Sequence, residues 1–368
     1  MNILHLNSNF NQSKIHKNIV ESMNSKPNIE GRVFYPENKM TSKSIELNYV
    51  DLVPCLNSYE KIFFQYRNKH LYRVARSLYK FNDYDTILAH SLYSNGSLAR
   101  VISENHKLPY SIIVTNTDYN LYIKKMKHLK NIGLKNLLGA KTIIFSSPAY
   151  LDSIINEFVP EKFKDEIKGK SVSIPFGVDD FWLDNLNYKN DFELSNRTVN
   201  VLYAGKINYN KNIQSIIEAV GKLIEQNYKI RLTIVGEPTD KYGKKLKLKN
   251  KKRNYITFIN NLDFKDLINV YRANDLFVMA SFKESFGLVY GEAMSQGLPV
   301  IYTKGQGFDK QFPDFTVGAP VTASSTGDIE SAIKYIINNY EELSRNATTK
   351  SNTLNWNLIS QRFINAIV

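Results

Sequence analysis

Residues 281–303 read SFKESFGLVYGEAMSQGLPVIYT, and this stretch decides the fold. The run DLFVMA before it and its own last five residues are continuously apolar, which is typical of strands buried in a parallel sheet. Between these runs, residues 287–296 have helical composition, and Gly297 supplies a stop signal. The stretch therefore predicts a strand, a loop, a helix, a turn and a second strand of an open α/β sheet.

Two carboxylates, Glu284 and Glu292, lie in this stretch with seven residues between them. Glu284 falls at the carboxyl end of a strand, just before a helix N-terminus whose free N–H groups suit anionic oxygens. Open α/β sheets bind ligands at this edge. A nucleotide sugar, which has hydroxyls in one part and phosphates in another, fits both features. In the simpler alternative, Glu292 is an ordinary surface residue of the helix, and Glu284 only interacts with the positive end of the helix dipole.

In the nucleotide-sugar interpretation, Glu284 accepts hydrogen bonds from sugar hydroxyls and Glu292 accepts them from the ribose. The backbone of the loop and of the first helical turn meets the diphosphate. The residues expected to contribute this backbone contact are Phe286, Gly287 and Leu288, and Ser285 beside them is also expected to bind the substrate.

Length and composition support two domains in a reducing compartment. A chain of 368 residues exceeds the usual size of one domain, and 43% hydrophobic residues are enough for two cores. The single cysteine, Cys55, excludes an internal disulfide framework. We find neither a signal peptide nor an apolar run of membrane-spanning length, so we expect a cytoplasmic protein. The net charge of +13 calls for an anionic partner, which could be a phosphorylated substrate, a membrane surface or nucleic acid.

The string ESFGLVYGEAMSQGLPVI, at residues 284–301, strongly resembles the E-x7-E signature of retaining GT-B glycosyltransferases. It is most similar to family 4, the glycosyl transferases group 1, of the bacterial surface-polysaccharide type. Both acids, the FGL core, the EAM run and the G-x-P-V turn match at once, so the signal is specific. The resemblance covers nearly the whole chain and is strongest over residues 205–301. It implies an α/β protein with two Rossmann-like domains that face each other across a cleft.

The resemblance also predicts the division of the chain. Residues 1–183 would form an acceptor-binding Rossmann-like domain. The polar, Asn-rich run at residues 184–198 lacks apolar periodicity and is the expected linker. Residues 199–352 would bind the nucleotide sugar. Residues 353–368 would form a helix that crosses back and packs on the first domain.

Two polar residues follow strands of the first domain. The loop after the first strand is glycine-rich in the related enzymes, whereas here it contains asparagines. Asn9 could contact the substrate, and an Asx turn explains the composition equally well. His90 follows the buried run TILA, at a position where the resemblance implies a cleft-facing histidine. A lone histidine is, however, more often structural.

The clearest departure from the family lies at residues 115–118, which read TNTD where relatives commonly have T-x-H-D. Thr117 stands at the place of a histidine that reaches the donor sugar. In a retaining transfer the leaving phosphate itself can deprotonate the acceptor, so activity does not require this histidine. Asp118 remains as a partner for a hydroxyl of the acceptor or the sugar, with Asn116 and Thr117 as additional donors.

The loop after the first strand of the second domain carries two cations, Lys206 and Lys211, behind Gly205. It resembles the family's G-R…K-G stretch, where two cations clamp the donor diphosphate. Lys206 keeps the charge of the usual arginine and loses its bidentate fork. The cations take the place of a metal, so we expect no metal and no cofactor. A later strand and loop, ending at Leu262, should bring backbone groups to the nucleobase.

Three segments are rich in lysine and arginine: residues 61–81, 119–138 and 241–253. The first two are predicted as basic amphipathic helices, since apolar residues recur at spacings of three and four. Ordinary helices with a solvated basic face would give the same pattern. The alternative is peripheral contact with an anionic membrane through the first domain. The third segment is predicted as a solvated helix.

Together these features predict a metal-independent, retaining transferase that moves a sugar from a nucleotide diphosphate sugar to a glycan acceptor. By analogy the acceptor is lipid-linked and lies at the inner face of the plasma membrane, as in bacterial polysaccharide biosynthesis. One alternative is a sugar-nucleotide epimerase or phosphorylase on the same scaffold. Another is a non-catalytic polyanion-binding protein, suggested by the charge and the missing histidine. No zinc finger, RNP string or helix-turn-helix supports nucleic acid as a partner.

Overall fold

The computed structural model describes residues 1–40, 46–57, 64–189, 194 and 197–368. The chain divides into two compact units. The first consists of Met1–Ser146, Tyr150–Pro175 and Trp356–Val368, and the second of Ser147–Ala149 and Phe176–Asn355.

The unit boundary at Phe176 precedes the expected linker. Residues 176–183, assigned to the first domain from the sequence, lie in the second unit. Within that unit, Trp182 packs on Phe264 and Tyr271. Of the expected linker at 184–198, residues 190–193 and 195–196 lie outside the described residues. The second unit extends to Asn355, just past the start of the segment predicted to cross back.

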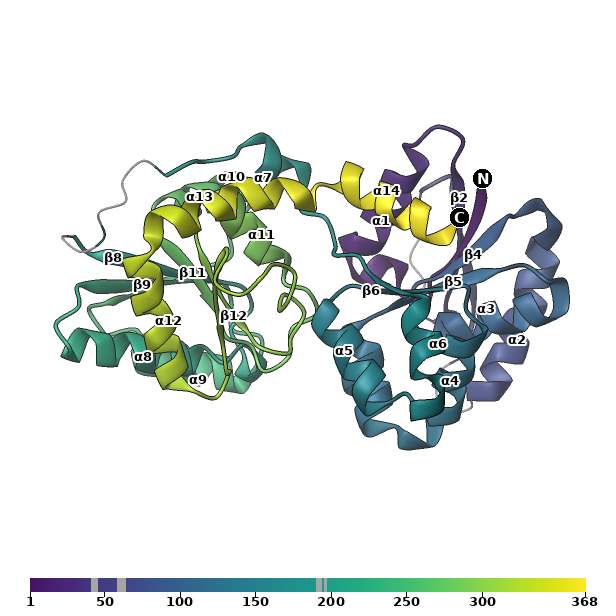
Figure 1. The fold of residues 1–368 in the computed structure, drawn as a ribbon, viewed down its shortest axis with the longest axis horizontal. Coiled ribbons are helices and arrows are strands. Elements are labelled where there is room, and N and C mark those ends of the chain that lie inside the picture. The colour runs from purple at the N-terminus through teal and green to yellow at the C-terminus, as the bar shows by residue number, and fades with distance from the viewer. Residues whose placement is uncertain (41–45, 58–63, 190–193, 195–196) are drawn as a thin grey trace. The chain divides into compact units, whose positions relative to one another are not determined.

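A seven-stranded, all-parallel sheet forms the centre of the first unit, in the order β3-β2-β1-β4-β5-β6-β7 (Figure 1). Its strands are β1 (Asn2–Leu6), β2 (Glu30–Asn38), β3 (Val50–Leu56), β4 (Thr86–Ala89), β5 (Tyr110–Val114), β6 (Thr142–Phe145) and β7 (Ser171–Ser173). The central strands β4 and β5 are buried along their whole length, as expected of apolar runs that are covered on both faces.

Helices connect these strands. The α-helices are α1 (Lys14–Asn24), α2 (Phe64–Leu78), α3 (Ser94–His106), α4 (Lys130–Gly139), α5 (Pro148–Glu157) and α6 (Lys164–Gly169). The short turns are η1 (Phe10–Gln12), η3 (Phe81–Asp83), the π-helical η4 (Asp118–Ile123), η5 (Lys127–Leu129) and η6 (Glu161–Phe163). Helix α1 begins directly after Ser13, whose hydroxyl accepts the Ile15 N–H at 3.2 Å and so caps the helix.

The second basic segment of the first unit differs from its prediction. A single helix was expected over residues 119–138, whereas the chain forms η4, leaves helical geometry at Met126 (φ −112°, ψ 60°) and continues as η5 and α4. The ring of Tyr122 stacks on Tyr93 at 4.6 Å, and this contact between distant segments is not visible in the periodicity. The first basic segment, expected over 61–81, is helical from Phe64, and residues 61–63 lie outside the described residues.

The second unit has a six-stranded parallel sheet in the order β10-β9-β8-β11-β12-β13 (Figure 1). Its strands are β8 (Val199–Ala204), β9 (Ile230–Val235), β10 (Ile256–Ile259), β11 (Leu276–Met279), β12 (Val300–Thr303) and β13 (Gly318–Val321). Its helices are α7 (Asp180–Asp184), α8 (Ile213–Glu225), α9 (Lys241–Asn250), α10 (Phe264–Arg272), α11 (Leu288–Ser295), α12 (Thr326–Asn338) and α13 (Tyr340–Ser351), with short turns η7 (Tyr209–Lys211) and η8 (Asn352–Leu354).

The carboxyl ends of β8 and β9 approach each other closely through two glycines. Gly205 and Gly236 have φ angles of +148° and +140°. A Cβ atom on Gly236 would lie 1.9 Å from the Gly205 carbonyl oxygen, so no other residue fits there without a backbone shift. This approach fixes the start of the loop that carries Lys206.

The last helix, α14 (Trp356–Ile367), belongs to the first unit. It packs on α1 and β6, with Ile359 and Phe363 fully buried. The Thr142 hydroxyl donates to the Ala366 carbonyl oxygen at 2.7 Å. The final segment is therefore held by the unit that also contains the start of the chain.

Among the helices formed by described residues, none combines the length and apolarity that a membrane crossing requires.

Candidate functional site

Two loops meet at the carboxyl edge of the second sheet, because β8 and β11 are neighbours in it. Asn210 links them twice: its carbonyl oxygen accepts the Phe282 N–H at 2.9 Å, and its side-chain amide donates to the Lys283 carbonyl oxygen at 2.8 Å. The buried amide of Asn212 also donates to the Ala280 carbonyl oxygen at 3.1 Å. These bonds bring the two predicted motifs, far apart in sequence, into one site.

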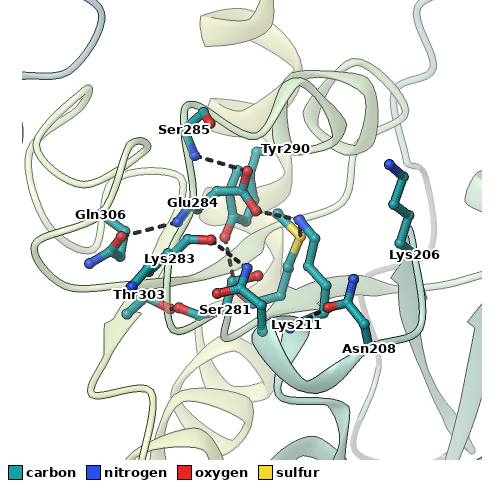
Figure 2. A network of polar contacts seen from close by, with 12 residues as sticks. Lys206, Asn208, Lys211, Ser281, Lys283, Glu284, Ser285, Tyr290, Thr303 and Gln306 are labelled. Atoms are coloured by element: carbon teal, nitrogen blue, oxygen red, sulfur yellow. Dashed lines mark hydrogen bonds and ion pairs between the residues drawn. The ribbon is translucent and has the colours of Figure 1, made fainter. Parts of the chain in front are cut away.

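Lys211 and Glu284 form an ion pair at the centre of this site (Figure 2). The distance from Lys211 Nζ to Glu284 Oε2 is 2.6 Å, and the two side chains are only 19% and 12% exposed. The Asn208 side-chain oxygen accepts the Lys211 N–H at 3.2 Å and holds the turn from which the lysine projects. The sequence predicted both residues for the site, and the structure brings them into direct contact.

Lys206 lies on the same loop and is exposed. Its carbonyl oxygen accepts the Tyr203 hydroxyl at 2.7 Å, while its amine stands apart from the Lys211–Glu284 pair (Figure 2). Within the described part of the chain this amine makes no ion pair or hydrogen bond. Lys206 is therefore a second cation at the same edge, held by its backbone, with a side chain that can reach toward an anion.

Helix α11 begins at Leu288, beyond the loop position of Glu284, and its N-terminus presents free N–H donors. Gly287 caps the helix with a φ of +79°, a left-handed conformation that favours glycine. No acceptor faces the N–H groups of Phe286, Gly287 and Leu288 among the residues that the structure describes. The Phe286 ring is 1% exposed and packs on Phe308, so this residue can offer a ligand its backbone only. A helix N-terminus of this kind suits a phosphate.

Glu292 lies on α11 and is half-buried. The Tyr271 hydroxyl on α10 donates to Glu292 Oε2 at 3.1 Å. Burial raises the pKa of Glu292 to about 7, the nearby charge of Asp179 adds to this rise, and the Tyr271 hydrogen bond opposes it. Near neutral pH this carboxyl is thus poised between its two protonation states. Leu262, predicted near the base, is a half-buried residue of the otherwise exposed loop after β10.

Asp118 in the first unit has a structural environment. Its carboxylate is 1% exposed and accepts the backbone N–H and the hydroxyl of Thr115, both at 2.9 Å, and the Tyr93 N–H at 3.4 Å. Burial raises the pKa of Asp118, and these hydrogen bonds oppose the rise. This geometry makes Asp118 a clamp between the loops after β4 and β5, which sequence reasoning did not foresee. Of its neighbours, Thr117 is exposed, and Asn116 accepts the Asn120 amide at 2.6 Å.

His90 belongs to a row of three histidines. Its Nε2 lies 3.0 Å from His5 Nδ1, and its Nδ1 lies 3.3 Å from His16 Nδ1. Burial lowers the pKa of His5 to about 3 and of His16 to about 4, and it lowers the pKa of His90 well below the usual range, helped by the charges of its two neighbours. Both ring nitrogens of His90 are thus engaged inside the unit. Sequence reasoning found His90 alone, since the row exists only because β1 and β4 pair.

Asn9 is exposed, and its N–H donates to the side-chain oxygen of Asn7 at 2.9 Å. This is the Asx turn that the sequence analysis weighed against a substrate contact. No group of three or more His, Cys, Asp or Glu side chains is arranged to hold a metal ion in the described ranges.

The two all-parallel Rossmann-like units define the class of protein, which is the GT-B fold. Solved structures of this class align over almost the entire chain. A sucrose-phosphate synthase from Thermosynechococcus elongatus has a TM-score of 0.73 at 16% identity and covers 99% of this chain and 98% of its own. An Anabaena protein solved in complex with UDP-glucose has a TM-score of 0.67 at 14% identity, with coverages of 99% and 98%.

The sequence comparisons give the family. Residues 184–352 match the model described as glycosyl transferases group 1. A relative named alpha-monoglucosyldiacylglycerol synthase, from Acholeplasma laidlawii, is 23% identical over 61% of this chain and 60% of its own length. The alignments span from about a third to under two thirds of the first curated relatives. The second unit, with the Lys211–Glu284 pair, belongs to the glycosyl transferases group 1 family.

Proposed function

We propose that the protein is a retaining glycosyltransferase that moves a sugar from a nucleoside diphosphate sugar to a glycan acceptor. The observation that carries this proposal is the Lys211–Glu284 pair, with a 2.6 Å contact at the carboxyl edge of a parallel sheet. A diphosphate needs the cation and sugar hydroxyls need the carboxylate. A nucleotide sugar supplies both groups in one molecule, so it satisfies both residues at once.

Each group of the site has a role in this reaction. Lys211, with Lys206 as a second cation, neutralises the charge that develops on the leaving diphosphate, and the free N–H groups of α11 add to this stabilisation. Glu284 orients the sugar through its hydroxyls. Glu292 accepts from the ribose in its ionised form. In this proposal the lysines carry the electrostatic task, and the reaction needs no metal.

The transfer itself breaks the bond between the anomeric carbon and the diphosphate oxygen. The acceptor hydroxyl attacks from the same face, and its proton passes to the departing phosphate oxygen, which serves as the base. The new glycosidic bond thus keeps the configuration of the donor. This route does not require a histidine at Thr117, and the inward-facing Asp118 clamp is compatible with it.

We infer a lipid-linked glycan acceptor at the inner face of the plasma membrane, in polysaccharide biosynthesis. Support comes from exposed cations on two segments of the first unit, with exposed apolar side chains among them. The cations are Lys69, Arg73, Arg76, Lys124, Lys125, Lys127 and Lys130, and the apolar residues are Tyr66, Leu78 and Leu121. This mixture suits an anionic lipid interface. The Acholeplasma relative, by its name, synthesises a glucosylated diacylglycerol, which is a lipid.

The donor can be found by screening nucleotide sugars for thermal stabilisation. A ligand at a hundred times its dissociation constant adds about 2.7 kcal/mol to the free energy of unfolding. The anomeric configuration of the product, read by NMR, then tests retention. A protein that binds no nucleotide sugar and yields no transfer product would contradict the proposal.

Replacing Lys211 with methionine is expected to lower kcat by about 10²–10³, because it removes a preorganised charge from a little-exposed site. Lys206→Met should cost only about fivefold, since exposed charges contribute about 1 kcal/mol or less. Steady-state assays with the screened donor measure both effects. Lys241→Met, which removes an exposed charge of α9, is the matched control and should leave kcat unchanged. Equal losses for Lys211→Met and Lys241→Met would refute the role of the pair.

Reversing three charges after η4, Lys124→Glu with Lys125→Glu and Lys127→Glu, is expected to weaken binding to anionic vesicles. Each basic residue near such a surface contributes about 1 kcal/mol, so the loss should be about a hundredfold or more. Sedimentation with vesicles containing phosphatidylglycerol at low salt measures it. The control reverses three exposed lysines of α9, which are Lys244, Lys245 and Lys249. A soluble acceptor, together with equal binding of both variants, would argue against the membrane proposal.

A further inference from the structure

We propose that Gln306 is a positioning residue that holds Glu284 in place for the sugar, an inference that rests on the proposed function of the Lys211–Glu284 site. Gln306 lies outside the acidic signature and was not among the predicted site residues. It belongs to the turn after β12, residues 304–309, which we call the β12 turn. Figure 2 shows its side chain reaching the backbone of Glu284 from the side opposite Lys211.

Two hydrogen bonds attach the β12 turn to the backbone of Glu284. The Gln306 side-chain oxygen accepts the Glu284 N–H at 3.0 Å, and the Gly307 N–H donates to the Glu284 carbonyl oxygen at 3.1 Å. Both backbone groups of one residue are therefore held by the same neighbouring turn. A carboxylate on an irregular loop gains its orientation from such contacts, since no helix or strand ladder fixes it.

The approach of the two loops is close. A Cβ atom on Gly307 would lie 2.0 Å from the Ser285 carbonyl oxygen, so only glycine lets the turn come near enough for the contact. On the other side, the Glu284 carboxylate accepts from Lys211 and from the Ser285 N–H at 3.1 Å. Glu284 is thus held by its backbone on one side and by its carboxylate on the other.

The β12 turn is itself well fixed. The Asp309 carboxylate, which is 6% exposed, accepts the Gly305 N–H at 2.8 Å, and the Asp309 N–H donates to the Gln306 carbonyl oxygen at 2.9 Å. The amide of Gln311 donates to the Gly307 carbonyl oxygen at 3.2 Å. A rigid turn can position its partner precisely enough to matter, since a displacement of about 1 Å can cost about a hundredfold in rate.

Hydrogen exchange tests the positioning without any substrate. In Gln306→Ala the Glu284 N–H loses its acceptor, so its exchange should accelerate by about tenfold or more. Gln306→Glu keeps an acceptor oxygen at the same distance along the side chain and should restore protection. Gln311→Ala is the comparison, since it removes one bond within the β12 turn and leaves the contact with Glu284 in place, so it should accelerate this exchange clearly less than Gln306→Ala. Unchanged exchange in Gln306→Ala would overturn the inference.

Kinetics test the consequence for transfer. With the donor identified by screening, Gln306→Ala should lower kcat by about tenfold or more, through misplacement of Glu284. Its affinity for the nucleoside diphosphate alone should stay within about threefold of the original, because the lysines and the α11 amides remain. A rate like that of Gln311→Ala would overturn the inference. If the original protein transfers no sugar while the exchange result holds, the positioning stands and the proposed function fails.

Discussion

Replacing Glu284 with glutamine is expected to tighten binding of a nucleoside diphosphate about tenfold while sugar transfer falls by about 10²–10³. The two effects have opposite signs because Glu284 serves two partners in turn. In the free protein it holds Lys211 at 2.6 Å in a little-exposed site. A diphosphate that binds Lys211 must displace the Glu284 carboxylate from it. Removing the carboxylate removes that competition, which lowers the binding free energy by about 1–2 kcal/mol for a partly buried pair.

The measurement is a calorimetric titration with UDP, and with ADP and GDP because the base is open, beside steady-state transfer. The Lys211→Met variant is the comparison, since it should weaken both binding and transfer. A Glu292→Gln variant changes a carboxylate on α11 outside the ion pair and should not tighten nucleotide binding. Weaker diphosphate binding in Glu284→Gln would contradict the competition.

The competition also distinguishes the donor from the product. In the proposed reaction, the phosphates of an intact donor would pair with Lys211 and its sugar hydroxyls would pair with Glu284, so neither charge would be left without a partner. After transfer the nucleoside diphosphate has no sugar, and Glu284 can recover Lys211 only if the diphosphate leaves. The ion pair therefore favours donor over product in the same site. If the proposed reaction is correct, this asymmetry would favour release of the product, a step that often limits kcat in enzymes.

The strand, helix and strand around the acidic signature were predictable because the residues of each element specify that element without distant contacts. Continuous apolar runs became β11 and β12, and the helix ended where Gly297 adopts a φ of +78°. Neighbouring parallel strands then bring their following loops to one edge, which places Glu284 near Lys211. Location in the fold thus follows from pattern and topology.

The direction of the side chains could not be predicted from sequence pattern and topology. Asp118 follows β5, which ends at Val114, and it begins η4. Its carboxylate turns inward, because two loops leave N–H groups there that need an acceptor. Gln306 follows β12 at the same edge of the sheet, and its bond to Glu284 depends on the close approach that Gly307 permits. Near the break at Met126, the stacking of Tyr122 on Tyr93 is likewise a contact between distant segments. Such contacts join residues that no local pattern relates.

Acidification is expected to destabilise the first unit steeply through the histidine row. The pKa values of His5 (about 3) and His16 (about 4), and that of His90, all lie below the ordinary 6.5 because the rings are buried. Below pH 6.5 the histidines of the unfolded chain therefore bind protons that those of the folded chain do not bind. The free energy of unfolding is highest above pH 6.5 and decreases as the pH falls toward the pKa values of the folded state.

Each such histidine costs about 1.4 kcal/mol per pH unit below 6.5, so three cost about 4 kcal/mol by pH 5.5. That is a large share of the 5–15 kcal/mol, roughly, that holds a domain together. Urea unfolding followed at several pH values measures the slope. His16→Gln should reduce it by one proton, because the edge ring no longer titrates, while His128→Gln, at an exposed position, should leave it unchanged. Equal slopes in His16→Gln and the original protein would mean that the row is not what makes the unit sensitive to acid.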